Sequence, residues 1–201
     1  MTQYTIKLSN SDEGVKDALE LTERTGTSIG LKGKDALKLR LLAEEMMNML
    51  QAIAGEFNAE FYFEHEGRDC KLHLSAKSDL DYEKRRELLS VSSSGKNEAR
   101  VGIMEKIRGI FEAGLWGMQE GFALQSEYGM GMFGLGAAGM PDDGVTNALY
   151  SWSMQKYKTE VREDADAWDE LEKSIIANIA DEVSVAVKRD SVVLTVRKNF
   201  R

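Results

Sequence analysis

The chain has 201 residues, a length that predicts one domain, or one domain with a large insertion, with enough apolar surface to fold without disulfides. Its 34 acidic and 26 basic side chains give a net charge of -8, which argues against a nucleic-acid partner because such surfaces need basic residues to displace phosphate counterions. Cys70 is the single cysteine, which excludes an internal disulfide framework and predicts a reducing, cytoplasmic location.

The N-terminal segment MTQYTIKLSN lacks the basic start and apolar run of a signal peptide. No later segment approaches the roughly 20 apolar residues of a membrane span, so we expect no membrane partner. Residues 4–9 (YTIKLS) alternate in polarity and predict a short strand. Residues 9–26 begin with serine and aspartate and then place Val15, Ala18, Leu19 and Thr22 at helical spacing, which predicts a helix.

Residues 30–56 give the strongest helix prediction, because their apolar side chains form one broad arc. This arc consists of Leu39, Leu42, Ala43, Met46, Met49, Leu50 and Ile53. The polar arc consists of Lys34, Lys38, Arg40, Glu44, Glu45, Asn48 and Gln51. Glu44 and Asn48 lie four residues apart, so they share one side of the predicted helix.

A β-hairpin is predicted next, because residues 58–67 and 68–78 alternate in polarity around a Glu-Gly-Arg-Asp turn. His65 and His73 fall one on each strand, and we interpret them as surface or satisfied interior histidines rather than catalytic groups. No Ser/His/Asp or Cys/His set is assembled from the sequence.

The long middle segment, residues 82–164, is expected to be an insertion. Within it, residues 98–125 predict a helix weakened by glycines, with Val101, Met104, Ile107, Phe111, Leu115 and Met118 at helical spacing. Residues 128–144 combine glycine and methionine, which suits an adaptable binding or self-association surface or a loop over the chain's own core. Residues 147–161 predict a strand that extends the sheet or reaches a neighbouring subunit.

The C-terminal part predicts one helix over residues 164–183, with Trp168, Leu171, Ile175 and Ile179 on one stripe. Residues 183–200 then predict two β-branched strands around the turn at 188–191.

These elements resemble, in order and separation, the histidine-kinase-like (GHKL) ATPases, and in particular their anti-sigma-factor serine kinases. The resemblance depends on the first strand and helix, the Glu44-x-x-x-Asn48 helix, the hairpin after it, and the IIANIADEV segment before the closing strands. It covers roughly residues 1–80 and 165–201. It implies a single α/β (α+β) two-layer sandwich of GHKL type over residues 1–201. In this fold a mixed, mostly antiparallel sheet has helices on one face, and residues 82–164 form an enlarged lid.

The resemblance implies ATP and Mg²⁺ as cofactors. Asn48 would then bind Mg²⁺ through its amide oxygen, and Glu44 would act as the base that orients or deprotonates a water or hydroxyl. A solvated helix face would also carry polar residues at these positions, and this alternative stays open.

The chain departs from the family at its glycine boxes. Residues 72–88 contain no glycine where Asp-x-Gly-x-Gly is expected, and Asp79 and Asp81 are either shifted adenine contacts or helix N-caps. Acidic residues lie within positions 169–172, where the family has a phosphate loop before its last helix. Gly95, Lys96 and Gly102 offer another phosphate loop, or an ordinary loop before a helix.

Three functional classes follow from the sequence. The first is an ATP-binding regulatory protein that phosphorylates a partner protein. This class includes a form of such a protein in which nucleotide binding is weakened or lost. The second is a catalytically inactive GHKL-fold interaction module that uses residues 128–144, with a homodimer as one form. The third is a plain ATP hydrolase.

Overall fold

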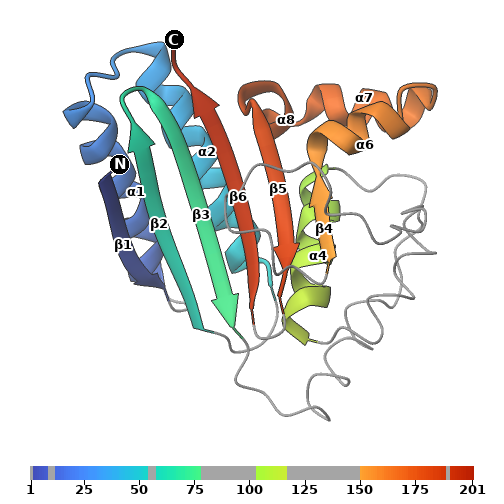
Figure 1. The fold of residues 1–201 in the computed structure, drawn as a ribbon, viewed down its shortest axis with the longest axis horizontal. Coiled ribbons are helices and arrows are strands. Elements are labelled where there is room, and N and C mark those ends of the chain that lie inside the picture. The colour runs from blue at the N-terminus through green and yellow to red at the C-terminus, as the bar shows by residue number, and fades with distance from the viewer. Residues whose placement is uncertain (1, 9–11, 54–57, 78–102, 117–149, 189–190) are drawn as a thin grey trace.

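The computed structural model describes residues 2–8, 12–53, 58–77, 103–116, 150–188 and 191–201 (Figure 1). Its strands are β1 (Thr2–Leu8), β2 (Asn58–Glu66), β3 (Asp69–Lys77), β4 (Tyr150–Ser153), β5 (Glu182–Val187) and β6 (Val192–Asn199). Its helices are α1 (Asp12–Ser28), α2 (Lys34–Gln51), α4 (Ile103–Trp116), α6 (Met154–Glu160), α7 (Ala165–Lys173) and α8 (Ile175–Ile179).

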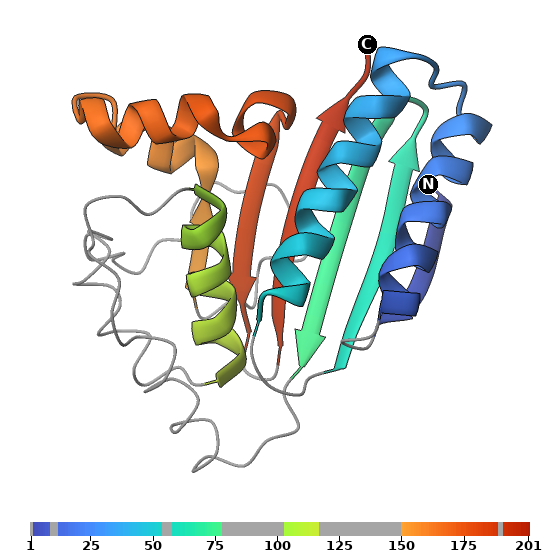
Figure 2. The ribbon, with the colours of Figure 1, turned by 180° about the vertical axis from the view of Figure 1, so that it is seen from behind.

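The six strands form one sheet in the order β1-β2-β3-β6-β5-β4. Figures 1 and 2 show α1, α2 and α4 side by side on one face, so the fold is an α+β two-layer arrangement as expected. Every described strand pair is antiparallel, which corrects the expectation of a mixed sheet. The reason is the connections: hairpins join β2 to β3 and β5 to β6, and the two successive helices α1 and α2 return the chain to β2 against the direction of β1.

The core lies between the sheet and the helices. Alternate residues of the central strands are fully buried and pair across the sheet, as where Leu74 pairs with Phe61 on one side and with Leu194 on the other. All seven members of the predicted apolar arc are buried, which confirms the orientation of α2, and Met47 is buried with them. A strand exposes every second side chain on its other face, and this face carries no helix among the described residues.

Helix α4 packs on β5 and β6 beside α2, and Gly114 brings it close to the sheet (Figure 2). A Cβ at Gly114 would lie 3.0 Å from Val187 Cγ2 and 3.0 Å from Val192 Cβ. Strand β4 pairs with β5 of the same chain, so the predicted extra strand extends the sheet. The strand expected over residues 147–161 is wrong beyond Ser153, because the Ser153 hydroxyl accepts a hydrogen bond from the Lys156 N–H and starts helix α6. The described parts of residues 82–164 therefore belong to the sheet and its helical layer, whereas Val101, Met118 and residues 128–144 lie outside the described residues.

The expected single helix over residues 164–183 is wrong, because the chain forms α7 and α8 with a break at Ser174. Ser174 has an extended backbone (φ -78°, ψ 125°), and its hydroxyl accepts a hydrogen bond from the Ala177 N–H at 3.4 Å. A serine that caps the next helix in this way competes with helix continuation. The predicted apolar stripe of this helix is therefore not buried as a unit. Leu171 is buried, but Trp168 and Ile175 are 38 % and 42 % exposed.

No described helix is long and apolar enough to span a bilayer.

Candidate functional site

Glu44 and Asn48 lie on the side of α2 that faces away from the sheet. Asn48 is exposed, and the Glu44 side chain is 32 % exposed. Helix α2 begins after Gly33, whose φ of 56° favours glycine, and its buried arc holds it over the middle of the sheet between α1 and α4 (Figure 2). The predicted pair is therefore on the polar arc, as its spacing indicated.

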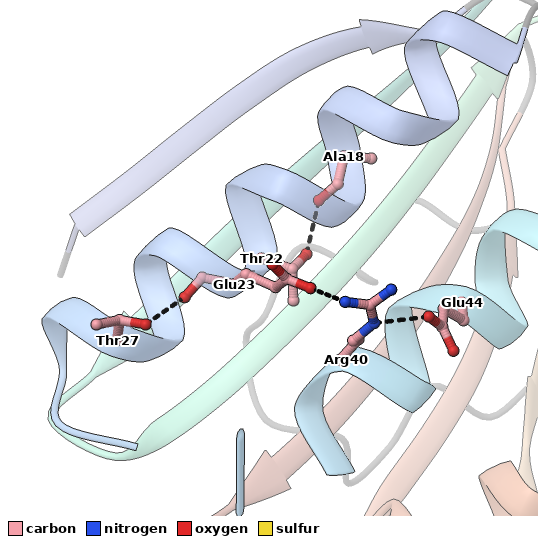
Figure 3. A network of polar contacts seen from close by, with 6 residues as sticks. All are labelled: Ala18, Thr22, Glu23, Thr27, Arg40 and Glu44. Carbon is pink, nitrogen blue, oxygen red and sulfur yellow. Dashed lines mark hydrogen bonds and ion pairs between the residues drawn. The ribbon is translucent and has the colours of Figure 1, made fainter. Parts of the chain in front are cut away.

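The Glu44 carboxylate is bound by Arg40, one turn earlier on the same helix (Figure 3). Arg40 Nε donates to Glu44 Oε1 at 2.7 Å, and Arg40 Nη1 donates to Glu23 Oε1 on α1. These two carboxylates raise the pKa of Arg40, and the hydrogen bond that Arg40 donates to Glu44 is the largest cause. The Arg40 guanidinium thus links α1 to α2. To act as a base, Glu44 would have to break its hydrogen bond with Arg40, or bind a substrate hydroxyl while it keeps that bond.

Asn48 offers an exposed amide oxygen next to this ion pair. Within the described ranges, no group of three or more His, Cys, Asp and Glu residues could hold a metal ion. A magnesium ion at Asn48 would therefore take most of its oxygen ligands from phosphate and water, which is common for Mg²⁺. The predicted adenine contacts Asp79 and Asp81, and the alternative phosphate loop at Gly95, Lys96 and Gly102, lie outside the described residues.

A second polar cluster surrounds His73, on the sheet face without a described helix. The His73 ring stacks on Tyr62 of β2, with 4.3 Å between ring centroids and 8° between ring planes. Its Nδ1 lies 3.0 Å from Thr195 Oγ1 on β6. Its Nε2 lies 3.4 Å from Glu64 Oε2, without the geometry of a hydrogen bond to any described group. A carboxylate, an imidazole and a hydroxyl from three neighbouring strands thus lie close together on one face of the sheet.

His73 is buried, with 8 % of its surface exposed. Burial lowers the pKa of His73 to about 4, and the Lys71 ammonium adds to the decrease, so the imidazole is neutral at neutral pH. Burial also raises the pKa of Tyr62, followed by the charges of Glu64 and Glu60.

The sequence did not reveal this cluster, because His73 and Thr195 are 122 residues apart. Strand register brings them together, since His73 pairs with Tyr62 on one side and with Thr195 on the other. The only local signal was that each occupies a polar position in an alternating strand. His65 belongs to the opposite face, where its ring lies 6.2 Å from Phe63 and its buried Nδ1 has no described partner.

The described elements follow the order predicted from the chain: strand, two helices, hairpin, and a closing hairpin. No family model, curated protein or solved structure matches this chain.

Proposed function

We propose that this chain is an ATP-binding regulatory protein similar to the anti-sigma-factor serine kinases, acting on a partner protein. The observation that carries the proposal is the exposed stripe Arg40-Glu44-Asn48, which repeats every four residues on α2. The order of elements around α2 supports it, because the resemblance depends on that order.

The stripe offers three groups that suit a magnesium nucleotide. Asn48 provides the amide oxygen for Mg²⁺, and the metal would supply charge neutralisation of the phosphates. Arg40 provides a planar guanidinium, which matches phosphate oxygens as well as it matches carboxylates. When Arg40 turns to a phosphate, Glu44 becomes available to hold the hydroxyl of a partner's serine or threonine.

A thermal-shift titration with Mg-ATP tests the proposal. At a concentration 100 times the dissociation constant, a ligand stabilises the folded state by about 2.7 kcal/mol. For a chain of this size, that raises Tm by roughly 5–10 °C. Asn48→Ala should lose most of this rise, whereas Gln51→Ala, which removes the other exposed amide of α2, should keep it.

Two results would count against the proposal in different ways. No stabilisation by millimolar Mg-ATP would refute ATP binding itself. A rise in Asn48→Ala equal to that of the wild type would show that the nucleotide binds elsewhere.

A second function is favoured by the Arg40 ion pairs. Because Glu44 is already neutralised by Arg40, we propose as the alternative a catalytically inactive interaction module that kept the fold. Light scattering and pull-down with residues 128–141 deleted would test this alternative, since unchanged association would remove those residues from the interface.

A further inference from the structure

We propose that Thr195, His73 and Glu64 form an acyl-transfer site that hydrolyses carboxylic esters, on the face of the sheet opposite α2. The three groups come from adjacent strands and lie in the order hydroxyl, imidazole, carboxylate. This activity is separate from nucleotide binding and does not depend on it.

The contacts around the imidazole assign a role to each nitrogen. The Glu64 carboxylate lies 3.4 Å from Nε2 without the geometry of a hydrogen bond, and its negative charge favours the tautomer with the proton on Nε2. Nδ1 is then the acceptor, 3.0 Å from Thr195 Oγ1, which is within reach for a base that takes the hydroxyl proton. Glu64 is therefore a positioning residue, and His73 and Thr195 are the reacting pair.

The sheet holds this pair in place. His73 and Thr195 are directly opposite each other in the β3–β6 ladder, so their backbones are fixed relative to each other. The parallel ring of Tyr62 covers one side of the imidazole and restricts its rotation. Thr195 is only partly buried, so its hydroxyl is not enclosed in the core.

Lys71 lies two residues before His73 on the same face of β3, and its register partners are Glu64 on β2 and Arg197 on β6. We assign its ammonium to stabilise the negative oxygen that forms beside Thr195. Ser184, the register partner of Thr195 on β5, adds a hydroxyl on the same face of the sheet. The nearby Arg197 guanidinium is bound to Asp69 at 2.7 and 3.0 Å and is not free for this role.

The reaction proceeds in two balanced halves. His73 Nδ1 accepts the hydroxyl proton as Thr195 Oγ1 bonds to the acyl carbon, and the bond to the leaving alcohol breaks as that oxygen takes the proton from Nδ1. A water molecule then repeats the sequence, giving its proton to Nδ1 and its oxygen to the acyl carbon. The bond between Thr195 Oγ1 and the acyl carbon then breaks as Oγ1 takes the proton from Nδ1, which restores the hydroxyl and releases the carboxylic acid.

The test uses p-nitrophenyl acetate with the full chain, followed by peptide mass analysis. We expect an acetyl group on the peptide that contains Thr195, and we expect Thr195→Val to abolish that label and lower the rate roughly 100-fold, the lower range for a lost general base and nucleophile. Thr5→Val is the matched control, because Thr5 lies in the same row of the same face on the edge strand β1 and should leave both unchanged.

Thr195→Ser keeps the hydroxyl and should keep the label, which separates loss of the nucleophile from loss of the fold. His73→Gln should lower the rate by a similar factor. Glu64→Gln should move the acidic limb of the pH-rate profile to lower pH, because the imidazolium loses its anion, whereas a purely structural role would leave the limb where it is.

Acetylation confined to lysines, or a Thr195→Val rate equal to that of the wild type, would overturn the proposal. The ester assay contains no nucleotide, so its failure and the failure of ATP binding are distinguishable.

Discussion

Acid should destabilise the folded chain through His73. Burial lowers the pKa of His73 to about 4, against 6.5 for the ordinary side chain. Between pH 6.5 and pH 4, His73 is therefore protonated in the unfolded chain but largely neutral in the folded chain. The free energy of unfolding falls as the pH decreases through this range. The loss that this difference predicts is about 2 kcal/mol at pH 5 and about 3 kcal/mol at pH 4, relative to pH 7.

Urea unfolding of the wild type and of His73→Gln between pH 4 and pH 7.5 measures this loss. Every other titrating group is common to both proteins, so the difference between their free energies of unfolding isolates His73. His65→Gln is the matched control, because it removes the other histidine and should retain the acid-dependent loss. NMR titration of the His73 ring gives the pKa directly.

The Glu64 carboxylate acts on the His73 pKa in the opposite direction to burial. Glu64 Oε2 lies 3.4 Å from His73 Nε2, and a carboxylate at that distance favours the imidazolium. If the wild type gained stability relative to His73→Gln as the pH fell, the carboxylate would outweigh burial and the imidazole would not be neutral. A difference that did not change with pH would show that His73 titrates alike in the folded and unfolded chain.

Three further substitutions test the packing and the helix ends. Gly114→Ala should destabilise the chain by about 1–3 kcal/mol in urea unfolding, because its Cβ would lie 3.0 Å from Val187 and Val192. Arg40→Gln should lower the free energy of unfolding only slightly, and less at 1 M salt, because its ion pairs are solvent-exposed. Ser174→Ala should cost about 1 kcal/mol as a lost cap, measured by thermal unfolding.

Local periodicity predicted most of the secondary structure because the period of a helix or strand depends only on residues a few positions apart. The apolar arc of α2 recurs every three to four positions, and all of its members are buried. The hairpins follow from alternation around short turns, and Gly67 occupies the first turn with φ 59°. The break at Ser174 escaped prediction because the apolar residues on both sides still fit one helical period. Only the cap geometry of Ser174 separates α7 from α8.

The two candidate sites differ in what a sequence can reveal about them. Glu44 and Asn48 were visible because four residues make one helical turn, but the spacing did not show that Arg40, one turn earlier, already holds Glu44. His73 and Thr195 were invisible, because their contact depends on β3 and β6 being neighbours in the sheet. The spacing of residues in a helix therefore predicts which side chains share one side of it. The groups that meet on a sheet come from distant segments, so their spacing in the sequence does not predict the contact. The 3.0 Å contact between His73 Nδ1 and Thr195 Oγ1 is of this second kind, which the sequence alone does not reveal.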